Sequence, residues 1–397
     1  MPIPLNVLRE KKWPVPCHPI GREVIGKRNL SEFTSLSHFT PDMEFIARKG
    51  YQYGHYPMPF DYLESHIVRE GTLKILPLPI PPEECGITSL VVDKTGRVFG
   101  STAGRRCHLF LWDPKEKKHI VKIGTIDTAC TKSSLAIVSD GSILLGIKPT
   151  SGESPLYRYV PGYSSNHLEK LAVPVRGEGI AVLAADSDAS CVYGLSSITG
   201  TFFYFDNKTN YVKVFEPLDE HNLFSEVLVV TPDGDVYGGC RWTEIFRYDH
   251  INEQIQRTII VAPSLAGRKM YNRISMLIFN QKDGYIYGGT SSDGLLFRFS
   301  PNLKEVISLG KPLAVPSIRC CVVTPNGDLY GIGGKEMCHL FRYLPDKCDM
   351  RDMGILSVAS PRHWDGYEFD AAVTGLEGEI YFGENDRISH LFIYYPA

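Results

Sequence analysis

The amino-acid sequence predicts an all-β protein in which seven similar four-stranded sheets form a closed ring. Three observations support this prediction. A pattern of short strands and turns recurs seven times along the chain. Glycine, tyrosine and phenylalanine are abundant, with 36, 21 and 19 residues among 397, which is typical of short strands joined by tight turns. No apolar run reaches the roughly 18 residues that a membrane-spanning helix needs.

Each copy of the repeat begins with two strands joined by a polar turn, as in LVVDKTGRVFG of the first copy and VLVVTPDGDVYGG of the fourth. Gly or Asn at the tip of such a turn supplies the positive φ that a tight hairpin requires. A third, aromatic strand such as HLFLW follows, and then a weaker fourth strand. The glycine that ends the second strand recurs every 43 to 52 residues, at Gly100, Gly146, Gly194, Gly238, Gly288, Gly331 and Gly383. This period indicates a seven-bladed β-propeller with four-stranded blades.

The chain order suggests how the ring closes. The seventh copy stops at Ala397, just after its third strand, whereas the segment before the first copy, TLKILPL at 72–78, looks like a fourth strand. We therefore expect residues 72–78 to complete the last blade and to cover two sheet edges. Residues 71–397 then form the propeller. Residues 1–70 lie outside the repeat and are predicted to be an arm packed on the ring, or a lid over one end of its channel.

Charge and cysteine usage restrict the partners and the compartment. The 42 basic and 45 acidic residues give a net charge of −3, so nucleic acid and anionic membranes are not expected as partners. The ten cysteines form no C-x-x-C motif and are interpreted as buried, reduced thiols. The start of the chain contains no apolar signal region. These features predict a cytoplasmic protein, or a secreted one if a leader has been removed.

The loops that lead into the first strands and those that join second to third strands emerge on one face of a propeller, where ligands usually bind. Arg and Lys gather in these loops although the whole chain is slightly acidic. A guanidinium group suits a carboxylate, and aromatic rings stack on sugars. This combination predicts an anionic carbohydrate as the ligand; the alternative is that these cations are solvated or paired with neighbouring acids. The predicted binding residues are Lys132, Arg176, Trp242, Arg268, Arg273, Arg319 and Trp364.

Proton-transfer candidates lie in the same loops. His221 and His363 precede different first strands and are not equivalent in the repeat, so we predict them as catalytic residues, together with Tyr271 and Tyr367.

Three other histidines have a different explanation. His108, His339 and His390 all occupy the position directly before the dipeptide Leu-Phe. Because this position recurs in the blades, we expect hydrogen bonds within each blade there rather than catalysis.

No cofactor is expected, because the sequence contains no P-loop, no G-x-S-x-G elbow and no H-E-x-x-H motif. A divalent metal remains an alternative. It would need carboxylate and amide groups lining the channel, for which the nearest candidates are Glu178, Glu226, Asn272 and Asp370.

The copies DGDVYGGC…EIFRYD and DGYIYGGTSSDGLLFRFSP resemble blades of seven-bladed enzymes that act on uronic-acid polysaccharides. These are the ulvan lyases, the oligogalacturonate lyases, and the related rhamnose–glucuronate lyases and rhamnosidases. The resemblance covers residues 71–397 and rests on the repeat, which streptogramin lyases and gluconolactonase-type lactonases share. No active-site motif of these families is matched residue by residue.

The resemblance implies β-elimination on a uronate. In such lyases His and Tyr typically act as base and acid, and Arg neutralises the substrate carboxylate. The resulting hypothesis is a lyase that cleaves uronate-containing oligosaccharides or polysaccharides. Two alternatives remain open: a glycoside hydrolase that releases a terminal sugar from a uronate, and a propeller that binds a ligand or a protein without catalysis.

Overall fold

The computed structural model describes Val68 and residues 70–397, apart from short gaps at 117–118, 163–167, 187, 219–222, 302–304, 336–337 and 357–365. The chain divides into two compact units. One comprises Met1–Val68 with Ile355–Asp365 and lies almost entirely outside the described residues, as does the predicted arm. The other, Arg69–Gly354 with Gly366–Ala397, carries the repeat and is described below.

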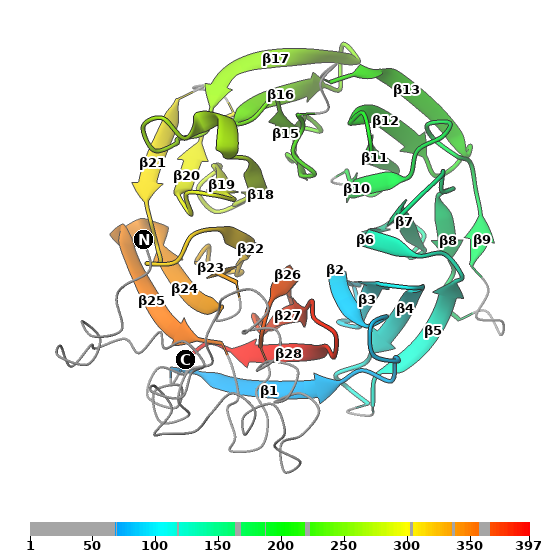
Figure 1. Ribbon diagram of the computed structural model, residues 1–397, viewed down its shortest axis with the longest axis horizontal. Helices are drawn as coiled ribbons and strands as arrows, with labels where there is room; N and C mark the ends of the chain where they lie inside the picture. The colour runs from blue at the N-terminus through cyan, green and yellow to red at the C-terminus, as the bar shows by residue number, and fades with distance from the viewer. Residues whose placement is uncertain are drawn as a thin grey trace, which may run out of the picture. The chain divides into compact units, whose positions relative to one another are not determined.

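The repeat forms seven four-stranded antiparallel sheets arranged as a ring (Figure 1). Blade 1 contains β2 (Gly86–Val92), β3 (Val98–Ala103), β4 (Cys107–Trp112) and β5 (Val121–Ile126). Blade 2 contains β6 (Cys130–Ile137), β7 (Ile143–Pro149), β8 (Tyr157–Tyr159) and β9 (Glu169–Lys170). Blade 3 contains β10 (Ile180–Ala185), β11 (Cys191–Ser196), β12 (Thr201–Asp206) and β13 (Tyr211–Pro217). Blade 4 contains β14 (Leu228–Val230), β15 (Val236–Cys240), β16 (Glu244–Asp249) and β17 (Gln254–Val261).

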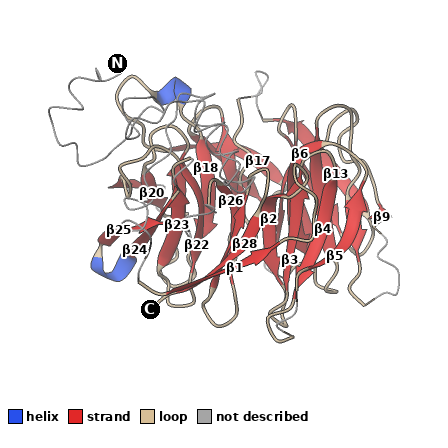
Figure 2. Ribbon diagram, turned by 60° about the horizontal axis from the view of Figure 1, so that its bottom comes forward, coloured by secondary structure: helices blue, strands red, loops and turns tan. Residues whose placement is uncertain are grey.

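The remaining blades follow the same order. Blade 5 contains β18 (Ile274–Phe279), β19 (Ile286–Thr290), β20 (Leu296–Phe299) and β21 (Val306–Gly310). Blade 6 contains β22 (Ile318–Val323), β23 (Leu329–Gly333), β24 (His339–Leu344) and β25 (Asp349–Ile355). Blade 7 contains β26 (Phe369–Thr374), β27 (Ile380–Glu384), β28 (His390–Tyr395) and β1 (Thr72–Pro77). Helical structure among the described residues is limited to two short 3-10 turns, Lys269–Tyr271 and Pro345–Lys347 (Figure 2).

The first strand of the ring completes its last blade, as predicted. β1 pairs antiparallel with β28, from Thr72 opposite Tyr395 to Pro77 opposite His390. The hydroxyl of Tyr394 also donates a hydrogen bond to the carbonyl of Glu70, at 2.9 Å. The strand therefore supplies the fourth edge of blade 7 and joins the beginning of the repeat to its end.

The recurring glycine of the second strand has a steric cause. A Cβ added to Gly100 would lie 2.1 Å from Cζ of Phe110, a ring on the neighbouring third strand. In blades 3, 4, 5 and 6 a Cβ added to the equivalent glycine would lie 2.2 to 2.5 Å from the phenylalanine of the third strand. At Gly146 and Gly383 the obstructing atoms belong to an isoleucine of the next blade, Ile180 or Ile87. The glycine thus leaves the space that the aromatic layer fills.

Hydrophobic clusters form between adjacent blades, and hydroxyl side chains connect the inner strands. One cluster combines Phe99 and Leu109 of blade 1 with Leu145 and Tyr157 of blade 2. The inner strands β2, β6, β10, β14, β18, β22 and β26 surround the ring axis (Figure 1).

Hydrogen bonds from buried hydroxyls link these inner strands across blade boundaries. Thr88 on β2 accepts a hydrogen bond from the backbone N–H of Ser133 at 2.9 Å, and Ser134 on β6 accepts one from Leu183 at 2.9 Å. These contacts satisfy backbone donors that the inner strand edges would otherwise leave unpaired.

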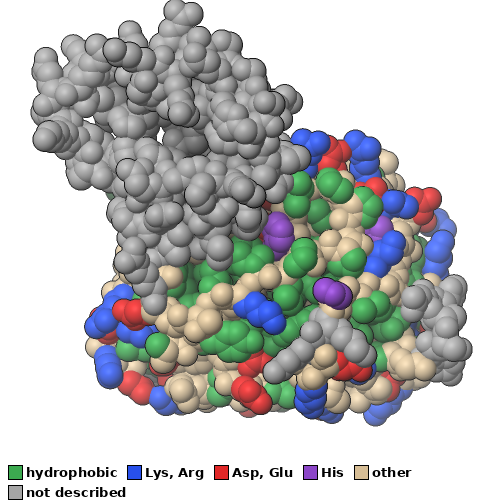
Figure 3. Space-filling view, turned by 90° about the horizontal axis from the view of Figure 1, so that it is seen from below, with side chains coloured by type: hydrophobic (Ala, Val, Ile, Leu, Met, Phe, Trp, Pro, Cys, Tyr) green, Lys and Arg blue, Asp and Glu red, His purple; other side chains and the backbone are tan. Residues whose placement is uncertain are grey.

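The outer surface carries charges of both signs. The side of the ring in Figure 3 shows Lys and Arg interspersed with Asp and Glu among apolar side chains, in keeping with the balanced composition. Within the described part of the chain, no helix has the length and apolarity needed to cross a membrane.

Candidate functional site

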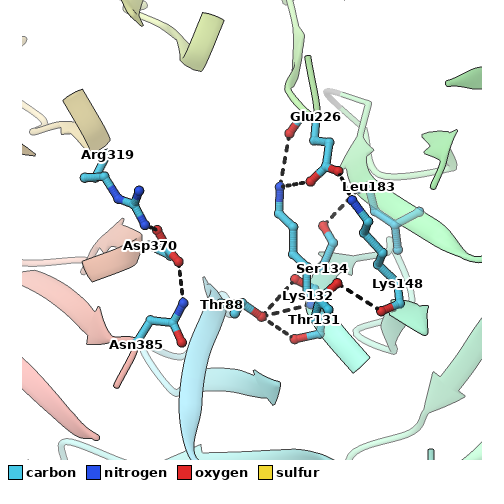
Figure 4. A network of polar contacts seen from close by, with 11 residues as sticks. Thr88, Thr131, Lys132, Ser134, Lys148, Leu183, Glu226, Arg319, Asp370 and Asn385 are labelled. Atoms are coloured by element: carbon cyan, nitrogen blue, oxygen red, sulfur yellow. Dashed lines mark hydrogen bonds and ion pairs between the residues drawn. The ribbon is translucent and has the colours of Figure 1, made fainter. Parts of the chain in front are cut away.

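Charged side chains converge where the chain enters the inner strands. Lys132 is on β6, Arg319 on β22 and Asp370 on β26, and Glu226 lies two residues before β14 (Figure 4). Two second-strand positions join them: Lys148 near the end of β7 and Asn385 just after β27. We call these six residues the entry cluster. Its members come from blades 2, 4, 6 and 7, so folding of the whole ring is needed to assemble it.

The half of the entry cluster near blade 2 is net positive. The Lys132 ammonium lies 3.1 Å from Oε2 of Glu226 and 3.3 Å from its carbonyl oxygen. The Lys148 ammonium lies 2.5 Å from Oε1 of the same carboxylate. Two cations therefore share one anion. Burial raises the pKa of the Glu226 carboxyl, but the two ammonium groups outweigh it, so the pKa lies below its ordinary value.

The half near blades 6 and 7 is built around the guanidinium of Arg319. The Arg319 guanidinium lies 2.5 Å from Glu368 and also forms an ion pair with Asp370. Asp370 in turn accepts a hydrogen bond from the side-chain amide of Asn385. Burial lowers the pKa of Arg319, but the facing Asp370 and Glu368 carboxylates raise it by more than burial lowers it. The net pKa is therefore above its ordinary value, and this guanidinium stays charged. The Arg319 guanidinium therefore contacts two carboxylates, one before and one within β26.

A glycine makes room for the amide in this half. A Cβ added to Gly86, the first residue of β2, would lie 2.2 Å from Oδ1 of Asn385. Gly86 therefore lets Asn385 lie across the boundary between blades 7 and 1 and reach Asp370.

Of the predicted binding residues, Lys132 and Arg319 belong to the entry cluster, whereas four others lie elsewhere. Arg176 is exposed. Arg268 has a half-exposed side chain, 3.3 Å from the buried carboxylate of Asp293. Arg273 donates to the carbonyl of Asn272 at 2.8 Å, which turns its guanidinium toward its own loop. Arg268 and Arg273 thus bind groups of their own blade and Arg176 is exposed, which corresponds to the alternative left open by the sequence.

Trp242 is held in a tight turn. Its φ is 59°, and the guanidinium of Arg241 lies 4.9 Å from the centroid of its ring. Arg241 therefore already stacks against the indole, which the sequence predicts as a sugar platform.

The four predicted catalytic residues are placed unequally. His221 and His363 lie outside the described residues, as does Trp364. Tyr271 is 71% exposed at the end of a 3-10 turn. Tyr367 is buried, and its backbone N–H donates to Glu384 at 3.1 Å. The described part of the chain therefore presents Tyr271 to solvent and places the ring of Tyr367 in the interior.

The three repeat-equivalent histidines form hydrogen bonds within their blades, which confirms the structural interpretation. His108 contacts Glu84 at 2.8 Å through Nε2, and His390 contacts Glu384 at 2.8 Å through Nδ1. His339 contacts Asp352 at 3.0 Å. Each ring thus links two segments of its own blade.

Two of the four metal-ligand candidates serve other structural purposes. The Glu178 carboxylate accepts hydrogen bonds from the backbone N–H groups of Ile198 and Thr199, at 2.8 and 3.0 Å. Asn272 is buried and donates to Asp293 at 2.9 Å. Among the described residues, no group of three or more His, Cys, Asp or Glu side chains is arranged to hold a metal ion.

Sequence reasoning missed Glu368 and Asn385 and did not distinguish Lys148 from other loop cations. The signal for Lys148 is the strand register, which places it directly opposite Lys132. Such a pairing between adjacent strands can be predicted from the repeat. The contact of Glu226, in blade 4, with the lysines of blade 2 cannot be predicted in this way, because it depends on the geometry of the closed ring.

Comparison with known proteins supports the fold. No protein-family model matches the chain, and no curated protein matches it. Virginiamycin B lyase from Staphylococcus aureus is similar in structure, with a TM-score of 0.65 at 11% identity, covering 83% of this chain and 100% of that one.

Two further solved structures have different described roles. A fungal alcohol oxidase of the AA5 family, in complex with copper, gives a TM-score of 0.59 at 13% identity over 83% of this chain and 76% of its own. An extracellular domain described as part of a hybrid two-component system, BT4673 from B. thetaiotaomicron, gives 0.61 at 14% identity. That match covers 83% of this chain but 40% of the other, so this chain spans less than half of that structure. At these identities the likeness shows the propeller fold alone.

Proposed function

We propose that this protein is a carbohydrate-active enzyme that cleaves uronic-acid-containing oligosaccharides or polysaccharides by β-elimination. The observation that carries the proposal is the convergence of Lys132 and Lys148 on one carboxylate at the entry to the inner strands. A pair of ammonium groups with a net positive charge suits the carboxylate of a uronate. The side chains of Lys132 and Lys148 are 32% and 33% exposed, so in this proposal the substrate carboxylate approaches them beside Glu226.

The residues of this site match one requirement of the reaction. A base removes the proton at C5 of the uronate, and the electron pair forms the C4–C5 double bond as the C4–O bond breaks. An acid protonates the leaving oxygen. Charge develops on the substrate carboxylate as C5 loses its proton, so the ammonium groups of Lys132 and Lys148 stabilise the enolate-like intermediate.

The acid and base remain predictions. His221, His363 and Tyr271 are the candidates, because each lies in or next to a segment that enters an inner strand. The fourth predicted catalytic residue, Tyr367, is set aside because its side chain is buried. Their side chains can exchange protons near neutral pH or act as a phenolic acid. The proposed ligand is an anionic carbohydrate, and no step needs a cofactor.

Enzymes among the structural neighbours are compatible with catalysis on this scaffold. One is named as a lyase and one as an alcohol oxidase, whereas another neighbour is described as an extracellular part of a signalling system. Fold does not decide among these roles, and the lysine pair is the feature that favours a uronate ligand.

The direct test is incubation of the full chain with a panel of uronate-containing oligosaccharides while the ultraviolet absorbance of the unsaturated product is followed. We expect absorbance to rise with at least one substrate, and to be lost in His221→Ala or His363→Ala. Lys94→Met is the control for a substitution outside the site, because Lys94 is exposed in the turn at the opposite end of β2. This variant should retain the rise in absorbance. Sugar release without new absorbance would indicate hydrolysis, and binding without turnover a non-catalytic propeller; either result contradicts the proposal.

A further inference from the structure

The segment that leads from blade 4 into blade 5 ends in an exposed turn. All residues at 265–271 are exposed, and we call this segment the rim turn. Three of its side chains are large and apolar: Leu265, Met270 and Tyr271 are 47%, 60% and 71% exposed. Apolar side chains that gather at one exposed place are typical of a surface that binds a ligand or a partner.

The backbone of the rim turn is anchored although its side chains are exposed. At its start, the backbone N–H of Leu265 donates to the carboxylate of Asp293 at 2.9 Å. At its end, the carbonyl of Tyr271 accepts a hydrogen bond from the hydroxyl of Ser292 at 2.6 Å. The next residue, Asn272, is buried and also donates to Asp293, at 2.9 Å. The turn is therefore held in place before any ligand binds, which lowers the entropy cost of binding.

A hydrogen bond connects the rim turn to the segment that carries Glu226 of the entry cluster. The backbone N–H of Ile274, the first residue of β18, donates to Oγ of Ser225 at 3.2 Å. Ser225 directly precedes Glu226, and Tyr271 lies three residues before Ile274. The Cα atoms of Tyr271 and Glu226 are therefore at most about 22 Å apart, because an extended chain spans no more than about 3.6 Å per residue. An oligosaccharide of several units spans such a distance.

The side chains of the rim turn suit a sugar unit that carries a carboxylate. The tyrosine ring offers a large and rigid contact area at a low cost in conformational entropy. Lys269, which is exposed in the same turn, provides a cation for the carboxylate. Water has access to the phenol of Tyr271, whereas a general acid is most effective in a site that excludes water. These features favour binding over proton transfer at Tyr271.

We propose that Tyr271 is a binding residue whose ring stacks on a sugar unit outside the cleavage site. The lysine pair then holds the carboxylate of the uronate that is cleaved, and the rim turn holds a later unit of the same chain. The preferred substrate is therefore an oligouronate of several units. This inference rests on the proposed function and gives Tyr271 a binding role in place of the acid.

Two probes that differ only in length test this role. They are oligogalacturonates of three and eight units, used with the full chain. For Tyr271→Ala we expect kcat/KM, or 1/Kd if binding alone is followed, to fall about 10-fold for the longer probe and about twofold or less for the shorter one. An equal loss for both probes overturns the inference.

Two further variants separate stacking from proton transfer and from general damage. Tyr271→Phe keeps the ring and lacks the hydroxyl, so it should recover most of what Tyr271→Ala loses on the longer probe. Tyr211→Ala is the matched control, because Tyr211 is 59% exposed at the start of the outer strand β13 and should leave the preference for the longer probe unchanged. Thermal melting identifies any variant that fails to fold.

The remaining outcomes distinguish this inference from the proposed function. If kcat falls equally in Tyr271→Phe and Tyr271→Ala, the hydroxyl takes part in the reaction, and the binding role is wrong while the proposed function stands. If Tyr271→Ala changes the oligomeric state in sedimentation and leaves both probes unaffected, the rim turn binds a second copy of the chain, which also overturns the inference. Failure of the unaltered protein to bind or cleave both probes and the whole uronate panel overturns the proposed function instead.

Discussion

The ammonium group of Lys148 lies 2.5 Å from the carboxylate of Glu226, although one residue belongs to blade 2 and the other leads into blade 4. The contact passes the intervening blade on the inner side of the ring. The contact therefore forms only when the inner strands of blades 2, 3 and 4 are arranged around the ring as they are in the folded protein. The same contact also limits how much positive charge the lysine pair can offer to a ligand.

Replacing Glu226 should separate these two roles. Glu226→Gln removes the shared carboxylate, so the free energy of unfolding should fall by about 1–2 kcal/mol near neutral pH. The freed lysines should bind an anionic oligosaccharide about 3- to 10-fold more tightly. Calorimetric titration and chemical denaturation measure the two effects, and a parallel loss of both would show that Glu226 is needed to position the lysines.

The contribution of Glu226 should also depend on pH. Its pKa in the folded chain lies below the ordinary value of 4.5, so its stabilising effect is present above pH 4.5 and is lost as pH falls through the folded pKa. The difference in melting temperature between the unaltered protein and Glu226→Gln should shrink below pH 4.5. A difference that stays constant down to the acid transition would contradict the ion-pair assignment.

The buried His108 should make the stability of the folded protein depend on pH in a second, higher pH range. Burial lowers its pKa below 6.5 although Glu84 opposes this change. The folded state thus favours the neutral ring, and its stability should fall as pH drops below 6.5 toward the folded pKa. The variant His108→Gln should lose less stability over this range, as measured by melting at a series of pH values. Identical slopes for both proteins would argue against a buried neutral imidazole.

The repeat glycine gives a steric prediction. In Gly288→Ala the new Cβ would lie 2.2 Å from Cζ of Phe297, so either the strands of the blade or the phenyl ring of Phe297 must shift. We expect a loss of about 1–3 kcal/mol in the free energy of unfolding. Adding Phe297→Leu should recover part of this loss, because the two residues share one space. Purely additive effects in denaturant titrations would show that the clash does not explain the glycine.

Most of the architecture could be predicted from the sequence because each blade is a local unit with its own strand and turn pattern. Gly100 and the equivalent glycines indicated where the second strands end. The chain order predicted that residues 72–78 form the closing strand. The histidine position represented by His108 was also predictable, because a contact within one blade repeats with the blade.

The site was less predictable because its members come from different blades. Lys132 and Arg319 were selected as loop cations, but Arg268 and Arg273 fitted the same description and bind groups of their own blade. What distinguishes the two kinds is whether the partner belongs to another blade, as for Lys132 and Arg319, or to the same blade. Contacts between blades depend on the geometry of the closed ring, which has no sequence signal.

The proposed function requires Lys132 and Lys148 to bind a substrate carboxylate together. Calorimetric titration of an oligouronate into the unaltered protein, Lys132→Met, Lys148→Met and Lys94→Met measures this binding. We expect each variant of the pair to weaken binding about 10-fold or more and Lys94→Met to leave it unchanged. Equal affinity in all four folded proteins would show that the lysine pair does not bind the substrate carboxylate.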